Sequence, residues 1–139
     1  MDLKEVRGCY DYHTGKAGDV GRQLALGGIA VVWLLHGDSR VLAFPKLLLI
    51  ALGFFCGSLA LDFLHYLSCS AIWGIYGRNK EKDLQGQGIN PASPAAIFDA
   101  PPFINWTGLI FYWAKGMALI IGGVYLGIYL WARISAADV

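Results

Sequence analysis

Three long apolar stretches, separated by polar segments, dominate the pattern of residues along the chain. The first, residues 24–36, is short for a membrane span of about 20 residues, but it reaches that length when its polar flank back to Ala17 is included. The second begins near Pro45, a favourable first-turn residue of a helix, and runs without a helix breaker to Tyr76. The third, residues 103–134, is interrupted by a single lysine. The pattern predicts an all-α integral membrane protein with three transmembrane helices.

The second apolar stretch is longer than a membrane span requires. At 1.5 Å per residue, a helix over residues 45–76 is roughly 48 Å long, whereas the hydrocarbon core of a bilayer is about 30 Å thick. Such a helix either tilts strongly or extends beyond the membrane. Because its last residues, SCSAIWGIYG, are less apolar than its first, we expect it to project into the cytoplasm.

The remaining segments complete one membrane domain over residues 1–139. The polar N-terminal stretch has no apolar core of the signal-peptide type, so we expect the first apolar segment to direct insertion. The segment between the second and third helices begins charged and becomes rich in Gly, Pro and Ala, which is typical of a loop. The predicted division is a cytoplasmic tail at 1–16, helices at 17–36, 45–76 and 105–134, and a cytoplasmic loop at 77–104.

Basic residues predict the orientation, because they concentrate on the cytoplasmic side of membrane proteins. Seven share one side of the predicted helices: Lys4, Arg7, Lys16, Arg22, Arg78, Lys80 and Lys82. Three lie on the other side: Arg40, Lys46 and Arg133. This asymmetry places the N-terminus in the cytoplasm and the C-terminus outside. Tryptophans, which favour membrane interfaces, agree with it as predicted anchors: Trp33 and Trp131 at the outer ends, Trp73 and Trp106 at the inner ends.

Composition supports a membrane location. Hydrophobic residues make up 56% of the chain and charged residues 15%, compared with about 25% charged residues in soluble domains. The net charge of +1 gives no signature of a nucleic-acid partner. Cys9, Cys56 and Cys69 have no metal-binding spacing, and we expect them to be reduced and structural.

Ionisable residues collect near one level of the predicted helices. Asp62 and His65 lie one turn apart on the same helical face. Asp62 is about 22 Å along the second span and Lys115 about 10 Å into the third, and helical side chains lean toward their own N-terminus. The two residues therefore converge in depth in the cytoplasmic leaflet, so an ion pair within one chain or between neighbouring chains is geometrically reasonable. The predicted polar layer consists of Asp19, Arg22, Gln23, Asp62, His65 and Lys115.

Three interpretations of this polar layer are open. Buried ion pairs could simply fix the register of the helices. The layer could instead line a wet vestibule or form a pH-sensitive gate built on His65. A catalytic or metal-binding role for Asp62 and His65 is the third interpretation. His36 lies on the far side of the predicted membrane, which excludes a His-rich metal site, and no hydrolase, metalloprotease or phosphate-binding motif is present. We therefore expect no enzymatic activity, metal or cofactor.

Glycines are abundant and predict close helix packing. The first span contains Gly27 and Gly28, the second has Gly53-x-x-x-Gly57 and the third has Gly123-x-x-x-Gly127. Small residues four positions apart let membrane helices approach closely. Because three helices are too few to enclose a pore, we expect a homo-oligomer; the alternative is a compact monomer that uses its glycines internally.

These observations lead to two hypotheses about function. In the first, an oligomeric protein without enzymatic activity forms or gates a pathway across the bilayer. In the second, the chain is a membrane anchor that docks a soluble cytoplasmic protein through its tail, the projecting end of the second helix and the 77–104 loop. By size and number of segments the chain is comparable with small bacterial membrane proteins, so we expect it in the bacterial inner (plasma) membrane.

Overall fold

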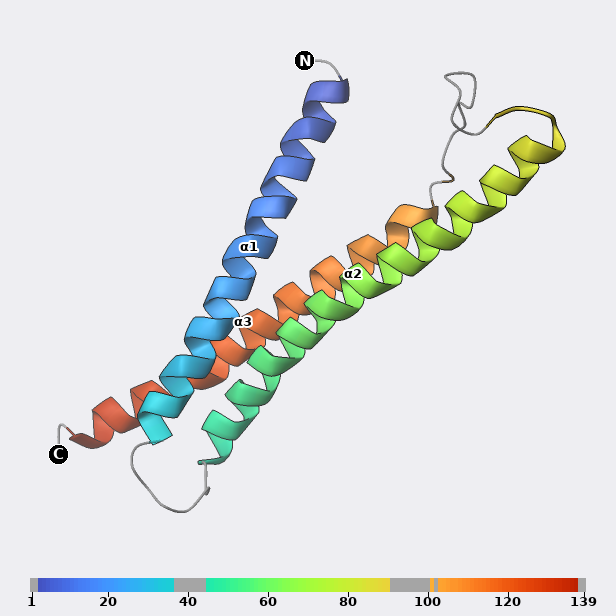
Figure 1. The fold of residues 1–139 in the computed structure, drawn as a ribbon. Helices are drawn as coiled ribbons and strands as arrows, with labels where there is room; N and C mark the ends of the chain where they lie inside the picture. Colours follow the sequence, from blue (N-terminus) through green and yellow to red (C-terminus); the bar gives the residue numbers. More distant parts are fainter. Residues whose placement is uncertain (1–2, 37–44, 91–100, 102, 138–139) are drawn as a thin grey trace. The chain divides into compact units, whose positions relative to one another are not determined.

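Three α-helices make up the described part of the chain. The computed structural model describes residues 3–36, 45–90, 101 and 103–137, with side chains omitted at 3–11 and 103–105. The helices are α1 (Leu3–His36), α2 (Lys46–Gly86) and α3 (Phe103–Ala137) (Figure 1). No strand occurs in these residues. Each helix contains a stretch long and apolar enough to cross a membrane, which confirms the prediction of an all-helical protein with three such segments.

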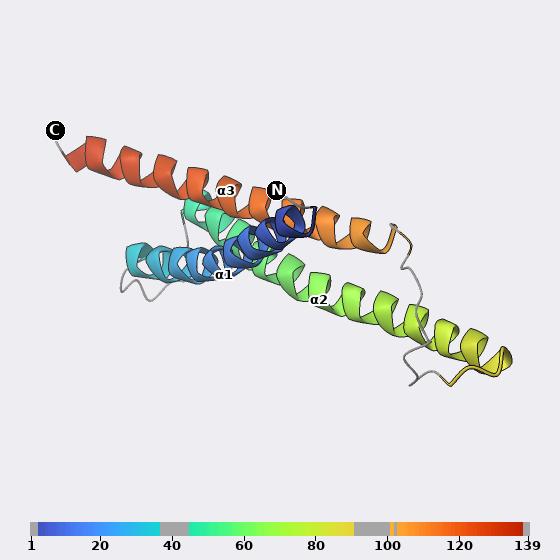
Figure 2. The same cartoon turned by 90° about the horizontal axis from the view of Figure 1, so that it is seen from above.

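All three helices extend beyond the predicted spans, α3 by less than one turn at each end. Helix α1 begins at Leu3, so the described part of the predicted tail continues the first helix. Helix α2 has 41 residues, a length of about 62 Å, and Figure 2 shows it without a break. Charged residues 78–85 are mostly good helix formers, which explains why they prolong α2 instead of starting the predicted 77–104 loop. Residues 91–100 and 102 of that loop lie outside the described residues.

Both ends of α2 have a local cause. At the start, the amide of Leu49 donates to the carbonyl of Pro45 at 3.0 Å, so this proline lies directly before the first helical residue, Lys46, instead of in the first turn as predicted. At the end, Gly88 adopts a left-handed φ of 73°. The amide of Gly88 donates to the carbonyl of Gln85 at 3.0 Å, and the amide of the next residue donates to the carbonyl of Leu84 at 2.9 Å. This is a Schellman motif, which favours glycine at its left-handed position.

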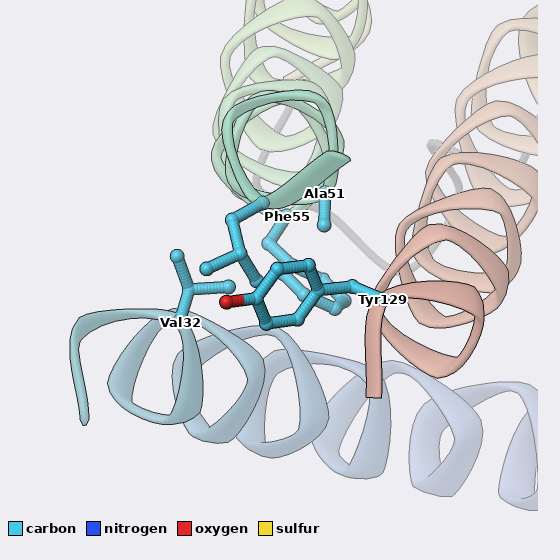
Figure 3. Close-up of a cluster of buried hydrophobic side chains, with 5 residues drawn as sticks. Val32, Ala51, Phe55 and Tyr129 are labelled. Carbon is cyan, nitrogen blue, oxygen red and sulfur yellow. The ribbon is translucent and has the colours of Figure 1, made fainter. Parts of the chain in front are cut away.

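The chain divides into two compact units, residues 1–61 with 113–139, and residues 62–112. In the first unit all three helices contribute to a buried apolar cluster. Figure 3 shows side chains of this cluster converging between the helices. Its members are Val32 from α1, Leu48, Ala51 and Phe55 from α2, and Tyr129 from α3.

Phe55 packs against glycines of both neighbouring helices. A Cβ placed on Gly28 of α1 would lie 2.6 Å from the Phe55 ring, and one on Gly122 of α3 would lie 3.0 Å from it. Real Cβ atoms do not approach an aromatic ring at the first of these distances. Two glycines on two different helices therefore form the notches that hold the ring, and each notch brings a helix backbone close to α2. Beside this contact, Phe54 stacks on Tyr125 with ring centroids 6.1 Å apart.

The buried positions of α2 follow one helical face. They are spaced three and four residues apart, as expected for a stripe along a helix: Leu48, Ala51, Phe55, Ser58 and Asp62. The stripe is apolar up to Phe55 and polar from Ser58 onward. The corresponding face of α1 is built mainly from small residues, with Gly21 close to Leu119 of α3 and Ala25 fully buried.

Candidate functional site

The α1 part of the predicted polar layer is an ion pair at the surface of the first unit. The guanidinium of Arg22 donates to the carboxylate of Asp19, one turn away. The Asp19 side chain is 57% exposed, and the adjacent Gln23 is exposed as well. Exposed pairs of this kind contribute about 0–1 kcal/mol in water, so this one does little to hold α1 against its neighbours.

Lys115 touches both other helices of the first unit. Its ammonium nitrogen lies 3.8 Å from the position of a Cβ on Gly18 of α1. Its backbone carbonyl accepts a hydrogen bond from the hydroxyl of Ser58 on α2 at 3.0 Å. The structure thus brings the lysine of the predicted layer to the helical turn that carries Asp19. Gly18 leaves space for the end of the lysine side chain at this point.

Ser58 is a buried polar residue outside the predicted polar layer. It is only 6% exposed, and its hydroxyl forms the interhelical hydrogen bond with α3. Such bonds contribute on average about 0.6 kcal/mol in membrane proteins. The sequence does point to Ser58 as part of this polar face, because Ser58 lies one turn before Asp62 on the same side of the helix.

Asp62 and His65 belong to the second unit, residues 62–112. Asp62 is 6% exposed, which is rare for a carboxylate. The His65 ring stacks on Phe111 of α3, with centroids 6.1 Å apart, and on Tyr66, with centroids 5.5 Å apart. Its Nε2 atom lies 3.4 Å from the position of a Cβ on Gly108. Helix α3 therefore approaches this imidazole closely at a residue without a side chain.

The predicted Asp62–Lys115 ion pair joins residues of different units and stays a prediction. Within the described ranges, no group of three or more His, Cys, Asp or Glu side chains could hold a metal ion. Cys56 and Cys69 are free cysteines, and the side chain of Cys9 lies outside the described residues.

The predicted packing glycines differ sharply in their surroundings. Gly28 contacts the Phe55 ring, whereas a Cβ would meet nothing within 4 Å at the other five: Gly27, Gly53, Gly57, Gly123 and Gly127. The contact on α3 is made instead by Gly122, which is not one of the predicted packing glycines. Consecutive residues point about 100° apart around a helix at 3.6 residues per turn, so Gly122 and Gly123 face different sides. The two G-x-x-x-G faces lie open on the outside of α2 and α3.

The predicted interface anchors lie on the surface. All four side chains, Trp33, Trp73, Trp106 and Trp131, are exposed. Together with the many other exposed apolar side chains, they give the described helices an outer surface that suits lipid better than water. The polar groups of Ser58 and Asp62, in contrast, are buried.

No protein family, no curated protein and no solved structure matches the chain.

Proposed function

We propose that the protein is a multi-pass integral membrane protein that assembles with copies of itself and forms or gates a pathway across the bacterial inner membrane. The observation that carries this proposal is Asp62, a buried carboxylate on a helix apolar enough to span a membrane. An ionisable residue inside a membrane costs about 2.5–3.5 kcal/mol on insertion scales and usually faces a bundle interior or a water-filled cavity.

The open glycine faces support self-association. Gly53 and Gly57 on α2 have free space beside them, as do Gly123 and Gly127 on α3. Membrane helices associate through such small-residue faces because close backbone packing replaces the hydrophobic drive that lipid removes. The chain therefore uses one set of glycines within itself and leaves a second set for another copy.

Cys56 offers a direct test of this contact, since it lies between Gly53 and Gly57 and is exposed. In a variant with Cys9 and Cys69 replaced by serine, oxidation in native membranes should cross-link Cys56 into a dimer. Gly53→Leu should abolish the cross-link, whereas Gly27→Leu, a matched change at an open position on another helix, should leave it. A monomer in native lipid, with no cross-link, would remove the oligomer from the proposal.

The pathway itself is tested by following the membrane potential with a dye while expression is induced. Wild-type protein should depolarise the membrane, and Asp62→Asn should not. Absence of depolarisation under every trigger tried would refute the pathway.

The orientation proposed from the basic residues is tested separately with Asn90→Cys, which an impermeant thiol reagent should label only from the cytoplasmic side.

The proposed Asp62–Lys115 pair is tested by the amount of each variant that accumulates in the membrane. If the two charges compensate each other, Lys115→Met should impair the protein and the additional change Asp62→Asn should partly restore its level in the membrane, because an unpaired buried charge is removed. Independent and additive effects would show that these residues do not meet.

The length of α2 favours a second candidate function, a membrane anchor for a soluble partner. About 30 Å of its roughly 62 Å would span the hydrocarbon core, so its capped end at Gly86 would stand in the cytoplasm. Co-purification distinguishes the two functions. A stable soluble partner that is lost when residues 80–100 are deleted, without any depolarisation by the intact protein, favours the anchor.

A further inference from the structure

We infer that the first unit binds the phosphate of an anionic phospholipid between α1 and α3, through Arg22 and Lys115 beside the helical turn of Gly18. The inference rests on the proposed insertion of these helices in a membrane, and it names a ligand that the proposed pathway does not include. It comes from two cationic side chains on two packed helices, which a glycine contact brings to one level.

The two cationic groups lie at one face of α1. The ammonium nitrogen of Lys115 lies 3.8 Å from the position of a Cβ on Gly18, so the lysine side chain reaches from α3 to α1 at this residue. Arg22 follows Gly18 by one helical turn on the same helix, which places both on one face, about 6 Å apart along the axis. The ammonium and the guanidinium are therefore close enough in depth for one phosphate group to contact both.

The charge at this place is positive. Arg22 forms an ion pair with Asp19, which nearly balances, and Lys115 adds a further positive charge. The Arg22 side chain is 39% exposed, so a headgroup can reach it. A guanidinium carries five N–H donors and an ammonium three, so each group can keep its contacts within the chain and donate to a phosphate as well. Arginine in particular binds phosphate through two parallel hydrogen bonds.

The depth of Lys115 suits a headgroup. From Lys115 to Arg133, α3 rises about 27 Å at 1.5 Å per residue, close to the hydrocarbon thickness of about 30 Å. Lysine side chains in membrane helices extend their ammonium toward the nearer interface. Here the ammonium reaches Gly18, in the polar segment that precedes the apolar stretch of α1. The two cations therefore lie where the phosphates of one leaflet would be.

A phospholipid fits this place better than a soluble anion. Beyond the two cations, both helices expose apolar side chains, with Leu24 on α1 57% exposed and Ile120 on α3 62% exposed. An acyl chain can lie along such side chains while its phosphate contacts the cations, whereas a free phosphate ion makes only the polar contacts. Basic sites between membrane helices bind the headgroups of anionic lipids in this way.

Lipid titrations of the full-length protein in detergent test the inference, with bound lipid counted by native mass spectrometry. Phosphatidylglycerol is the probe, and phosphatidylcholine with the same acyl chains is its zwitterionic counterpart. Wild-type protein should bind phosphatidylglycerol at lower concentration than phosphatidylcholine. Arg22→Gln and Lys115→Gln should each weaken phosphatidylglycerol binding about fivefold, the contribution of one basic residue near an anionic lipid surface. Lys115→Arg, which keeps the charge, should retain it.

Matched controls remove the same charges elsewhere. Arg133→Gln and Lys46→Gln alter exposed residues and should leave phosphatidylglycerol binding unchanged. Gly18→Leu keeps every charge but places a side chain where the Lys115 ammonium lies, so it should weaken binding as well. Circular dichroism establishes that each variant keeps its helices, and Arg22→Gln, at a part-exposed position, covers the case in which Lys115→Gln does not fold.

The outcomes separate this inference from the proposed function. A preference for phosphatidylglycerol that is lost with Arg22→Gln and Lys115→Gln, and kept in both controls, supports the site. Equal binding of the two lipids, or a preference that survives both substitutions, overturns it. Displacement of the lipid by an equal concentration of inorganic phosphate identifies a free anion as the ligand and also overturns it. Membrane insertion is tested independently by alkaline extraction of native membranes: release of the protein overturns the proposed function, whereas a retained protein without the lipid preference overturns this inference alone.

Discussion

Replacing Gly28 by alanine tests the closest helix contact in the first unit. The added Cβ would lie 2.6 Å from the Cε2 and Cζ atoms of Phe55 and 2.9 Å from its Cδ2 atom. The ring cannot simply retreat, because Gly122 on α3 already limits it on another side, at 3.0 Å from a Cβ at that position. Either the ring leaves its rotamer or α1 moves away from α2.

The size of the effect follows from two opposing terms. Overpacking a well-packed core costs about 1–3 kcal/mol, and the upper half of that range applies because Phe55 is enclosed by two helices. Alanine in place of glycine in a helix contributes up to about 1 kcal/mol in the other direction. We therefore expect Gly28→Ala to lower the free energy of unfolding by about 1–2 kcal/mol.

Gly27→Ala is the matched control, since it makes the same change one residue away, where a Cβ meets nothing within 4 Å. It shares the helix-propensity term and lacks the steric one, so it should be neutral or stabilising. The difference between the two variants, about 2–3 kcal/mol, then isolates the contact with Phe55. The second change Phe55→Leu should recover part of the loss, as expected for side chains that touch.

Reversible unfolding in mixed detergent micelles, followed by circular dichroism, measures these differences. The refuting result is a Gly28→Ala variant as stable as Gly27→Ala to within about 0.5 kcal/mol, the usual error of additivity. That outcome would mean that Phe55 does not occupy the notch of Gly28. The packing of α1 against α2 around this ring would then be wrong.

Three further predictions follow from single contacts. Ser58→Ala should lower stability by about 0.6 kcal/mol in the same unfolding assay, because the carbonyl of Lys115 loses its interhelical hydrogen bond; an unchanged stability would contradict that bond. Gly88→Ala should cost about 1 kcal/mol locally, because alanine disfavours a φ of 73°, and amide exchange over the last turns of α2 should accelerate; unchanged exchange would contradict the cap. Gly108→Leu should displace the ring of His65, which a shift of the imidazole NMR signals reports, whereas an unchanged spectrum would refute the close approach of α3.

The number and character of the helices could be predicted from the sequence because lipid imposes a length and an apolar composition on every span. The ends could not be predicted in the same way. Five of the residues 78–85 are charged, which favours a loop in the sequence, yet most of these eight residues are good helix formers and continue α2 to Gly86. Charge indicates where a helix leaves the membrane, whereas the left-handed Gly88 determines where it ends.

The packing glycines show a second limit of sequence reasoning. A G-x-x-x-G spacing identifies a small-residue face and does not say whether that face meets its own chain or another. Gly122 and Gly123 are neighbours in the sequence, but only Gly122 meets Phe55. The information that decides between them is the position of the large side chain on another helix, and it becomes visible only when the helices are packed.

The face of α2 that is buried changes its character within two turns. Phe55 ends its apolar part, Asp62 lies in its polar part, and the boundary between the two compact units falls between them, after Leu61. An apolar seal needs close backbone contact and no water, whereas a carboxylate needs polar neighbours or water to offset the cost of burial. One helix can meet both demands only by separating them along its length. Changes at Gly28 or Phe55 should therefore act on the stability of the packed helices, whereas Asp62→Asn should in addition remove the depolarisation expected of the proposed pathway.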